Sequence, residues 1–373
     1  MMARGAASQD EAGRSFLAPG YRPPADSDEK GLWSLMDRAE RRFKTSRFVV
    51  REPTLNTYLH DVVCRLGKDY CEDLRIYIIR TPYFNASMAP NGMMQVWTGL
   101  LLRCKDEAQL AAILGHEMGH YLRRHTVERW RDMRDKSALG AVLGLGLAVA
   151  GAGNARVLTD LALGASMFAF SRDQEREADE IGLELMVKAG YTPLGAPEVW
   201  EQLIAEAKAG TAERTSSFLF ATHPETEERL ETLREKSKQA DSKSGQRGRD
   251  RYDAGLAQVR NQLVHDELAL RQYGRSEVVF QRLLAQTPDD GLLWFAKGEI
   301  YRLRDGEGDA ERALDAYNTA IGTTGAPPET YRSIVLVELK RGERQEAEKA
   351  FARYLELRPE ASDAGGLRMI LKQ

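Results

Sequence analysis

The sequence predicts an α+β, mostly helical protein with two domains. Apolar residues recur at helical spacing over residues 110–122, and a short strand-like segment follows the turn at residues 90–92. The run KSKQADSKSGQRGRDR at residues 236–251 is polar and contains glycine, so we expect a flexible linker there. Beyond it, aromatic residues recur at a period typical of stacked helix pairs. We therefore divide the chain into a tail (1–28), a first domain (29–235), the linker (236–251) and a repeat domain (252–373).

The composition is that of ordinary globular domains. The 373 residues leave room for two domains, and a net charge of −3 with 29% charged residues gives no basic excess for binding nucleic acid. Residues 1–28 contain no apolar stretch like that of a secretory signal, and we expect a disordered tail. The cysteines Cys64, Cys71 and Cys104 form no C-x-x-C pair, and Cys64 and Cys71 can bond only if their geometry allows.

Residues 116–120 read His-Glu-Met-Gly-His, within a segment that we expect to be helical. Asp106 is a suitable N-cap, with Gln109 three positions later, and an apolar face follows. His116 and His120 then project from one face and can hold a divalent metal, while Glu117 stands beside the remaining coordination position. This arrangement indicates a zinc hydrolase in which Glu117 takes a proton from metal-bound water. The alternative is a pair of buried core histidines with hydrogen-bond partners.

A hydrolytic zinc ion usually takes a third protein ligand. His125 lies one residue short of the third histidine in the pattern H-E-x-x-H-x-x-G-x-x-H, so we expect an exposed helix-end residue. Glu175 and Asp179 are better candidates, because they are four residues apart and share a face if the segment is helical. Glu175 can then reach the metal while Asp179 accepts the second ring N–H of a ligand histidine. The alternative is a solvated acidic helix turn.

The two motifs together resemble the M48 family of zinc metalloproteases, which includes CAAX prenyl endopeptidases, OMA-type mitochondrial proteases and bacterial envelope members. Residues 171–182, S-R-D-Q-E-R-E-A-D-E-I-G, are similar to the family's E-x-x-A-D element. His223, followed by Pro224 and an arginine-bearing segment, resembles a third element. The segment from Phe84 to Gly92 resembles a fourth, with Asn91 where a second glycine is common. The resemblance covers roughly residues 30–235.

This resemblance implies a zincin-like protease domain that binds one Zn²⁺ per chain through His116, His120 and Glu175, with Asp179 in a supporting role. It also implies that Glu117 is the base that later passes its proton to the leaving amine. For His223 three roles stay open. It donates a hydrogen bond to the oxyanion, or it occupies the fourth zinc position until substrate arrives, or it is a structural residue at a helix N-terminus.

The implied substrates are proteins or peptides bound in extended form. In families of this kind, a strand at the sheet edge near the metal pairs with the substrate through main-chain hydrogen bonds. We expect the strand after the residue 90–92 turn to bind substrate in this way, through Met93, Met94, Gln95, Val96 and Trp97. An ordinary core strand is the alternative.

The C-terminal segment contains a repeat. Small residues precede aromatic residues by four positions at three places: Ser276 and Phe280, Ala313 and Tyr317, Ala347 and Phe351. Tyr317 and Phe351 are 34 residues apart, and the longer spacing before Tyr317 places extra residues in a loop at 305–309. The pattern resembles the tetratricopeptide repeat, which predicts an α-solenoid that holds a substrate or partner protein. A plain helical bundle is the alternative.

Residues 137–155 are uncharged and long enough to span a membrane, but glycine and alanine stand where leucine is expected. We expect a buried or membrane-surface helical hairpin, and a true membrane span is the alternative. If the hairpin lies at a membrane surface, residues 137–170 make the contact. The resemblance implies a periplasmic or envelope-associated enzyme that cleaves misfolded or stalled envelope proteins, although a cytoplasmic location also fits the visible sequence. A chaperone or assembly factor with rare proteolysis, and a non-catalytic scaffold stabilised by zinc, are the alternative functions.

Overall fold

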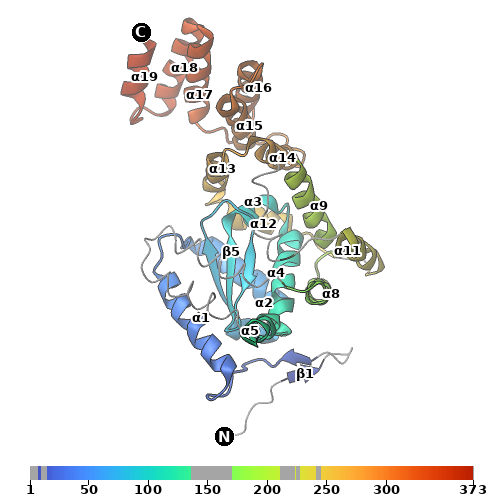
Figure 1. Cartoon of the computed structure of the whole chain (residues 1–373). Coiled ribbons are helices and arrows are strands. Elements are labelled where there is room, and N and C mark those ends of the chain that lie inside the picture. The colour runs from blue at the N-terminus through green and yellow to red at the C-terminus, as the bar shows by residue number, and fades with distance from the viewer. Residues whose placement is uncertain are drawn as a thin grey trace. The chain divides into compact units, whose positions relative to one another are not determined.

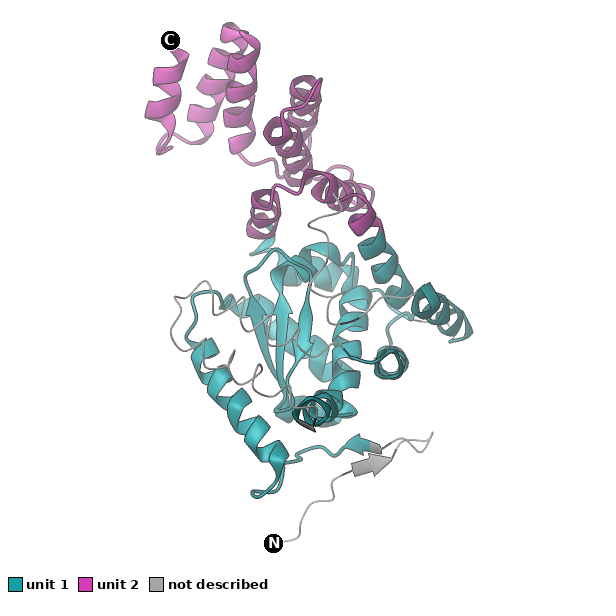
Figure 2. Cartoon of the chain, viewed as in Figure 1, with its two compact units in different colours: residues 1–204, 215–260 teal, residues 205–214, 261–373 magenta. Residues whose placement is uncertain are grey.

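The computed structural model describes residues 7–9, 15–135, 170–210, 223, 227–240 and 245–372 (Figure 1). The chain divides into two compact units, residues 1–204 with 215–260 and residues 205–214 with 261–373 (Figure 2). The predicted membrane-surface hairpin at residues 137–155 lies outside the described residues. Within the described ranges, every helix is too short or too polar to cross a membrane.

A three-stranded mixed sheet lies in the first unit. Strands β3 (Arg75–Ile79) and β5 (Met93–Trp97) run parallel, and β4 (Ala86–Met88) pairs antiparallel with the other side of β5. All five residues of β5 are buried. The prediction that this strand forms the sheet edge is therefore wrong. It is the central core strand, because β3 and β4 pair with its two sides, and these two strands are the edges of the sheet.

Helices surround this sheet. Helix α2 packs against β3, and helix α4 packs against β4 (Figure 1). The helices of this unit are α1 (Asp28–Lys44), α2 (Pro53–Leu66), α3 (Thr98–Arg103), α4 (Glu107–Leu122), α5 (His125–Asp135), α8 (Arg172–Lys188), α9 (Gly195–Lys208, which continues into the second unit), α11 (Glu227–Gln239) and α12 (Arg249–Leu256), with a short 3₁₀ helix η1 (Lys68–Asp73) and strands β1 (Ala7–Gln9) and β2 (Ser15–Leu17).

Helix α4 runs through the core of the first unit. Asp106 is its N-cap and accepts a hydrogen bond from the Gln109 backbone at 3.0 Å, as the sequence predicts. The Gln109 side chain accepts from the Lys105 backbone at 2.9 Å. All 16 residues of α4 are buried, so the two histidines are held inside the protein rather than on its surface.

The N-terminal segment differs from the predicted disordered tail from residue 15 onward. Leu17 and Tyr21 are buried, and the Gly20 backbone N–H donates to Asp73 at 2.6 Å. The Tyr70 hydroxyl donates to the Leu17 carbonyl at 2.7 Å. Two apolar side chains and a few specific hydrogen bonds hold a segment whose composition alone indicates disorder.

The predicted linker also differs from the observed structure. Residues 236–239 form the last turn of α11, and residues 249–251 begin α12. Between them, Gln246 exchanges backbone hydrogen bonds with the loop after α8, donating to Gly190 at 2.9 Å and accepting from Thr192 at 3.1 Å. Arg247 forms ion pairs with Asp106 at 2.9 Å and Glu198 at 2.6 Å. Arg247, a basic residue of the predicted linker, is therefore paired with acidic groups of the first unit.

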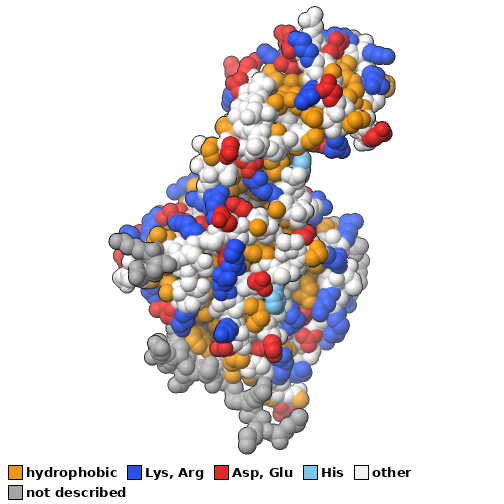
Figure 3. Space-filling model, turned by 180° about the vertical axis from the view of Figure 1, so that it is seen from behind, with side chains coloured by type: hydrophobic (Ala, Val, Ile, Leu, Met, Phe, Trp, Pro, Cys, Tyr) orange, Lys and Arg blue, Asp and Glu red, His pale blue; other side chains and the backbone are white. Residues whose placement is uncertain are grey.

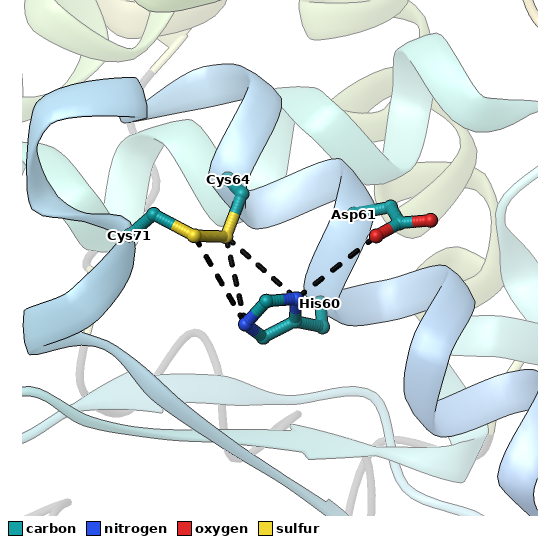
Figure 4. The surroundings of a disulfide bond; sticks show 4 residues. All are labelled: His60, Asp61, Cys64 and Cys71. Atoms are coloured by element: carbon teal, nitrogen blue, oxygen red, sulfur yellow. Dashed lines mark hydrogen bonds and ion pairs between the residues drawn. A yellow bond between two sulfur atoms is a disulfide. The ribbon is translucent and has the colours of Figure 1, made fainter.

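Cys64 and Cys71 form a disulfide that joins the end of α2 to η1 (Figure 4). The exposed His60 ring lies beside it, 3.6 Å from the Cys64 sulfur. Cys104 is buried and is not part of this disulfide. The sequence left open whether Cys64 and Cys71 lie close enough to bond, and in the structure they do.

The second unit consists of helices that pack in order along the chain. Helix α14 packs against α15, α15 against α16, α16 against α17, and α17 against α18. The repeated aromatic residues Phe280, Tyr317 and Phe351 are all buried. The helices of this unit are α13 (Arg260–Ala269), α14 (Tyr273–Leu284), α15 (Gly291–Arg304), α16 (Asp309–Ile321), α17 (Glu329–Arg341), α18 (Arg344–Leu357) and α19 (Ala364–Leu371).

The face of the molecule in Figure 3 carries charged side chains of both signs. On the face shown in Figure 3, lysine and arginine side chains are interspersed with aspartate and glutamate rather than gathered into one basic field. This distribution agrees with the net charge of −3.

Candidate metal centre

Helix α4 places His116 and His120 side by side. Their Nε2 atoms are 3.1 Å apart, and both rings are buried. Glu117 follows His116 on the same helix and is also buried. Its Oε1 atom has no hydrogen-bond partner in the part of the chain that the structure describes, and it lies 3.4 Å from Nε2 of His223. A buried carboxylate oxygen without a donor is costly unless a ligand completes the site.

Helix α8 crosses α4 closely because both helices have glycine at the crossing. A methyl group on Gly182 would lie 2.8 Å from the His116 backbone nitrogen, and one on Gly119 would lie 2.9 Å from Ala178. Ser171 caps α8 and forms a capping box with Gln174. This close packing brings the first turn of α8 to the two histidines.

Glu175 is the residue of α8 that reaches them. Its Oε2 lies 3.5 Å from His116 Nε2, and its Oε1 lies 3.5 Å from His120 Nε2. His223 completes the group, with its Nδ1 at 3.1 Å from His116 Nε2 and 3.0 Å from Glu175 Oε1. One ligand atom from each of these four residues lies within 4.8 Å of all the others.

These spacings fit a tetrahedral metal ion. Zinc bonds to imidazole nitrogen and carboxylate oxygen are about 2.0–2.2 Å long, so neighbouring ligand atoms in a tetrahedron are about 3.3 Å apart. The separations of His116 Nε2 from the ligand atoms of the other three residues are 3.1–3.5 Å, and those of Glu175 from His120 and His223 are 3.0–3.5 Å. Unprotonated nitrogens at this distance repel each other unless a cation lies between them. The donor set and its geometry therefore fit a divalent metal such as zinc.

Asp179 and Arg229 contact the candidate metal ligands His116 and Glu175. Asp179 Oδ1 lies 2.9 Å from Nδ1 of His116, one turn of α8 after Glu175. Arg229, on α11, donates to both Asp179 oxygens at 2.8 Å and lies 2.7 Å from Glu175 Oε2. Its guanidinium therefore neutralises the two buried carboxylates together. Of the sequence element around His223, residues 222 and 224–226 lie outside the described residues.

His125 is not the exposed residue that the sequence predicts. It is buried, and its Nδ1 lies 2.9 Å from Nδ1 of His120. Its Nε2 lies 3.0 Å from Glu177 Oε2, and Glu177 is paired with Arg123 at 2.7 Å. Sequence reasoning missed this group because it compared His125 only with the third-ligand position of a known pattern, one residue away, and expected an exposed residue at the helix end. The signal was present in the closeness of His125 to the motif and in the E-x-E spacing of Glu175 and Glu177.

Burial and charge set the protonation of the centre. Burial lowers the pKa of His120 well below 6.5, which keeps its imidazole neutral as a metal ligand requires. Burial raises the pKa of Glu117 above 4.5, which makes it a stronger base. Burial opposes ionisation of Glu175, but neighbouring His223 and His120 hold the pKa of Glu175 far below its usual range. Burial disfavours charge on His223, yet Glu175 and Glu117 outweigh it and raise its pKa above 6.5.

A helix with two histidines and an adjacent glutamate, crossed by a second helix that supplies a carboxylate, defines a metallopeptidase-type centre. The profile of peptidase family M48 matches residues 50–237, half of the chain. The chain belongs to this family.

Named relatives come from mitochondria and bacteria. The chain is 35% identical over 161 residues to the mitochondrial metalloendopeptidase OMA1 of Schizosaccharomyces pombe, which covers 43% of this chain and 45% of the relative. It is 27% identical over 287 residues to the beta-barrel assembly-enhancing protease of Escherichia coli, covering 74% and 54%. A putative beta-barrel assembly-enhancing protease of Vibrio cholerae is 27% identical over 212 residues, covering 54% and 43%. The chain spans about half the length of these relatives.

Proposed function

We propose that this protein is a zinc-dependent endopeptidase. The observation that carries the proposal is the four-residue group of His116, His120, Glu175 and His223, whose ligand atoms have tetrahedral spacing with Glu117 beside them. Bound zinc supplies a Lewis acid that polarises the scissile carbonyl and makes water acidic near neutral pH.

Glu117 performs the proton transfers in this proposal. It accepts a proton from the attacking water and later delivers it to the leaving amine. The raised pKa of Glu117 favours both steps, since a carboxylate of higher pKa is a better proton acceptor and holds the proton until the amine departs. Asp179 and Arg229 do not take part directly. They fix the ring of His116 and the carboxylate of Glu175.

We further propose that His223 closes the site. Its Nδ1 has the tetrahedral spacing of a fourth ligand, and its Nε2 faces Glu117 at 3.4 Å, so one ring blocks both the open position and the base. His223→Ala should then raise peptidase activity toward unstructured protein. Lower activity in this variant would favour the oxyanion role, and unchanged activity a structural role.

The edge strand β4 is the better candidate for substrate pairing than β5. Within the described chain, β4 pairs only with β5, so its outer side is open for an extended peptide. Met88 at the end of β4 lines a small cavity together with His120, which puts this edge close to the metal centre. A direct probe of this pairing is a peptide with N-methylated backbone amides, which should bind more weakly than its unmodified form.

The second unit, in this proposal, is a tetratricopeptide-like array that holds a protein partner or substrate. A methyl group on Gly298 would lie 2.3 Å from the Tyr317 ring, a small-against-large contact between the two helices of one pair. A groove of about 510 Å³ between α16, α17 and α18 has a mixed lining that suits a peptide, including Leu314, Ile334, Glu338 and Lys349.

The site of action that we propose is an oxidising compartment such as the cell envelope. The Cys64–Cys71 disulfide supports this, because such bonds persist mainly outside reducing compartments. The Escherichia coli relative is named a beta-barrel assembly-enhancing protease. By analogy with it, we propose misfolded or stalled envelope proteins as the substrates. An assembly factor with rare, gated proteolysis is the second candidate function, and the closed position of His223 favours it.

Glu117→Gln tests the enzyme proposal. The variant should bind zinc like the wild type, because Glu117 is not among the four ligand residues. Casein hydrolysis should fall by about 10²–10⁴-fold, the usual value of general base catalysis. Wild-type hydrolysis by this variant would rule out the mechanism. Loss of zinc binding would contradict the assignment of Glu117 as a base that is not itself a metal ligand.

A further inference from the structure

The turn between α4 and α5 brings an unassigned histidine to the metal centre. In a continuous helix, His125 would point about 140° away from His120, since five residues rotate by about 500°. Instead, Arg124 adopts a left-handed conformation with φ 60, which ends α4 and starts α5 at His125. This reversal sets the two Nδ1 atoms 2.9 Å apart.

The N-terminal segment holds this turn in place. A left-handed conformation is unfavourable for a residue with a side chain, so it persists where surrounding contacts determine it. The Arg124 guanidinium pairs with Glu29 of α1 and lies over the Tyr21 ring at 5.3 Å. The Tyr21 hydroxyl donates to the same Glu29 carboxylate at 3.1 Å.

The metal dictates the direction of the hydrogen bonds. If His120 binds zinc through Nε2, that nitrogen gives its lone pair, and the ring proton must be on Nδ1. Nδ1–H of His120 then donates to Nδ1 of His125, whose own proton is on Nε2 and is donated to Glu177 at 3.0 Å. Arg123 fixes the far oxygen of Glu177 at 2.7 Å.

We propose that His125 and Glu177 are positioning residues for the metal ligand His120. They form a neutral imidazole relay that fixes its tautomer and ring plane, whereas His116 has the carboxylate of Asp179 directly. This inference rests on the proposed zinc site, because without a metal on Nε2 the direction of the relay is undetermined. Loss of such support typically weakens metal binding by about 10–100-fold.

Zinc affinity tests the relay, measured on the full chain by competition with a chromophoric chelator. His125→Phe keeps a ring but removes the acceptor, and it should weaken zinc binding by about 10–100-fold. His125→Asn retains an acceptor oxygen near the Nδ1 position and should recover much of this loss. Glu177→Gln should give a smaller loss than His125→Phe. His60→Phe, at an exposed histidine of the same unit, is the matched control and should bind zinc normally.

The outcomes separate the relay from the proposed function. His116→Ala should abolish tight zinc binding, and if the wild type binds no zinc through His116, the proposed function fails with the relay. If the wild type binds zinc and His125→Phe binds it equally well, only the relay is overturned. Failure of His125→Asn to recover affinity would likewise indicate a role in packing alone.

A second measurement does not depend on any variant folding. In zinc-loaded wild type with ¹⁵N-labelled histidine, long-range ¹H–¹⁵N spectra report which ring nitrogen carries the proton. The relay predicts a proton on Nε2 of His125 and on Nδ1 of His120. A proton on Nδ1 of His125 would leave it unable to accept from His120 and would overturn the proposal.

Discussion

Gly182→Ala should weaken zinc binding without touching a ligand side chain. Helix α8 crosses α4 at this glycine, and the added methyl would lie 2.8 Å from the His116 backbone nitrogen and 3.0 Å from the Gly115 carbonyl carbon. Ordinary contacts of this kind are about 3.5 Å long, so the two helices must separate by roughly 0.7 Å. Metal–ligand bonds tolerate only about 0.2 Å. The shift therefore exceeds what the bonds from Glu175 and His116 can absorb together.

We expect the zinc affinity of Gly182→Ala to fall by about tenfold or more, which is the scale of a disturbed ligand position. Overpacking should also lower the free energy of unfolding by about 1–3 kcal/mol. The assays are chelator competition for zinc and urea denaturation for stability.

Gly31→Ala is the matched control for this change. Gly31 lies within α1, and an added methyl there meets no atom of the described chain within 4 Å. The control should bind zinc normally and gain about 0.5–1 kcal/mol in stability. Zinc binding by Gly182→Ala equal to that of Gly31→Ala would refute the reasoning that helix separation sets the ligand geometry.

Further predictions concern stability. Replacing both Cys64 and Cys71 with serine should lower the free energy of unfolding of the first unit by about 2–3 kcal/mol, as expected for a short disulfide loop; an unchanged urea midpoint would contradict this. Burial disfavours the charged form of Glu40, but bonds from Arg75 and Tyr77 hold its pKa below 4.5, so its stabilising effect is present above that pH and lost as the pH falls through the folded pKa. Glu40→Gln should therefore flatten the acid loss of stability seen by urea denaturation. Gly298→Ala should destabilise the second unit by about 1–3 kcal/mol, measured by calorimetry, because the methyl meets a buried tyrosine ring.

The parts of the site that depend on local spacing could be predicted from the sequence. His116, His120 and Glu117 follow from one helical turn, and the N-cap at Asp106 follows from the residue types around it. The structure brings Glu175 to the same point, 3.5 Å from His120, although helical spacing alone could not say which partner the α8 face meets. The assignment of Glu175 as a metal ligand rested on the occurrence of both motifs in one chain, as in the family that they resemble.

The parts that depend on non-local contacts could not be predicted. The order of the sheet puts β5 in the centre, and no pattern within residues 93–97 states which strands pair with it. His125 reaches His120 only because a non-glycine residue, Arg124, adopts a left-handed turn that distant Glu29 stabilises. The arginine-rich segment around Arg247 looks like a linker until its acidic partners are known.

The most direct test of the metal centre is an anomalous diffraction map at the zinc edge from crystals of the purified protein. The account predicts one peak per chain, about 2.0–2.2 Å from Nε2 of His116, Nε2 of His120 and a carboxylate oxygen of Glu175. A peak elsewhere, or zinc bound to the histidines with Glu175 outside bonding distance, would contradict it.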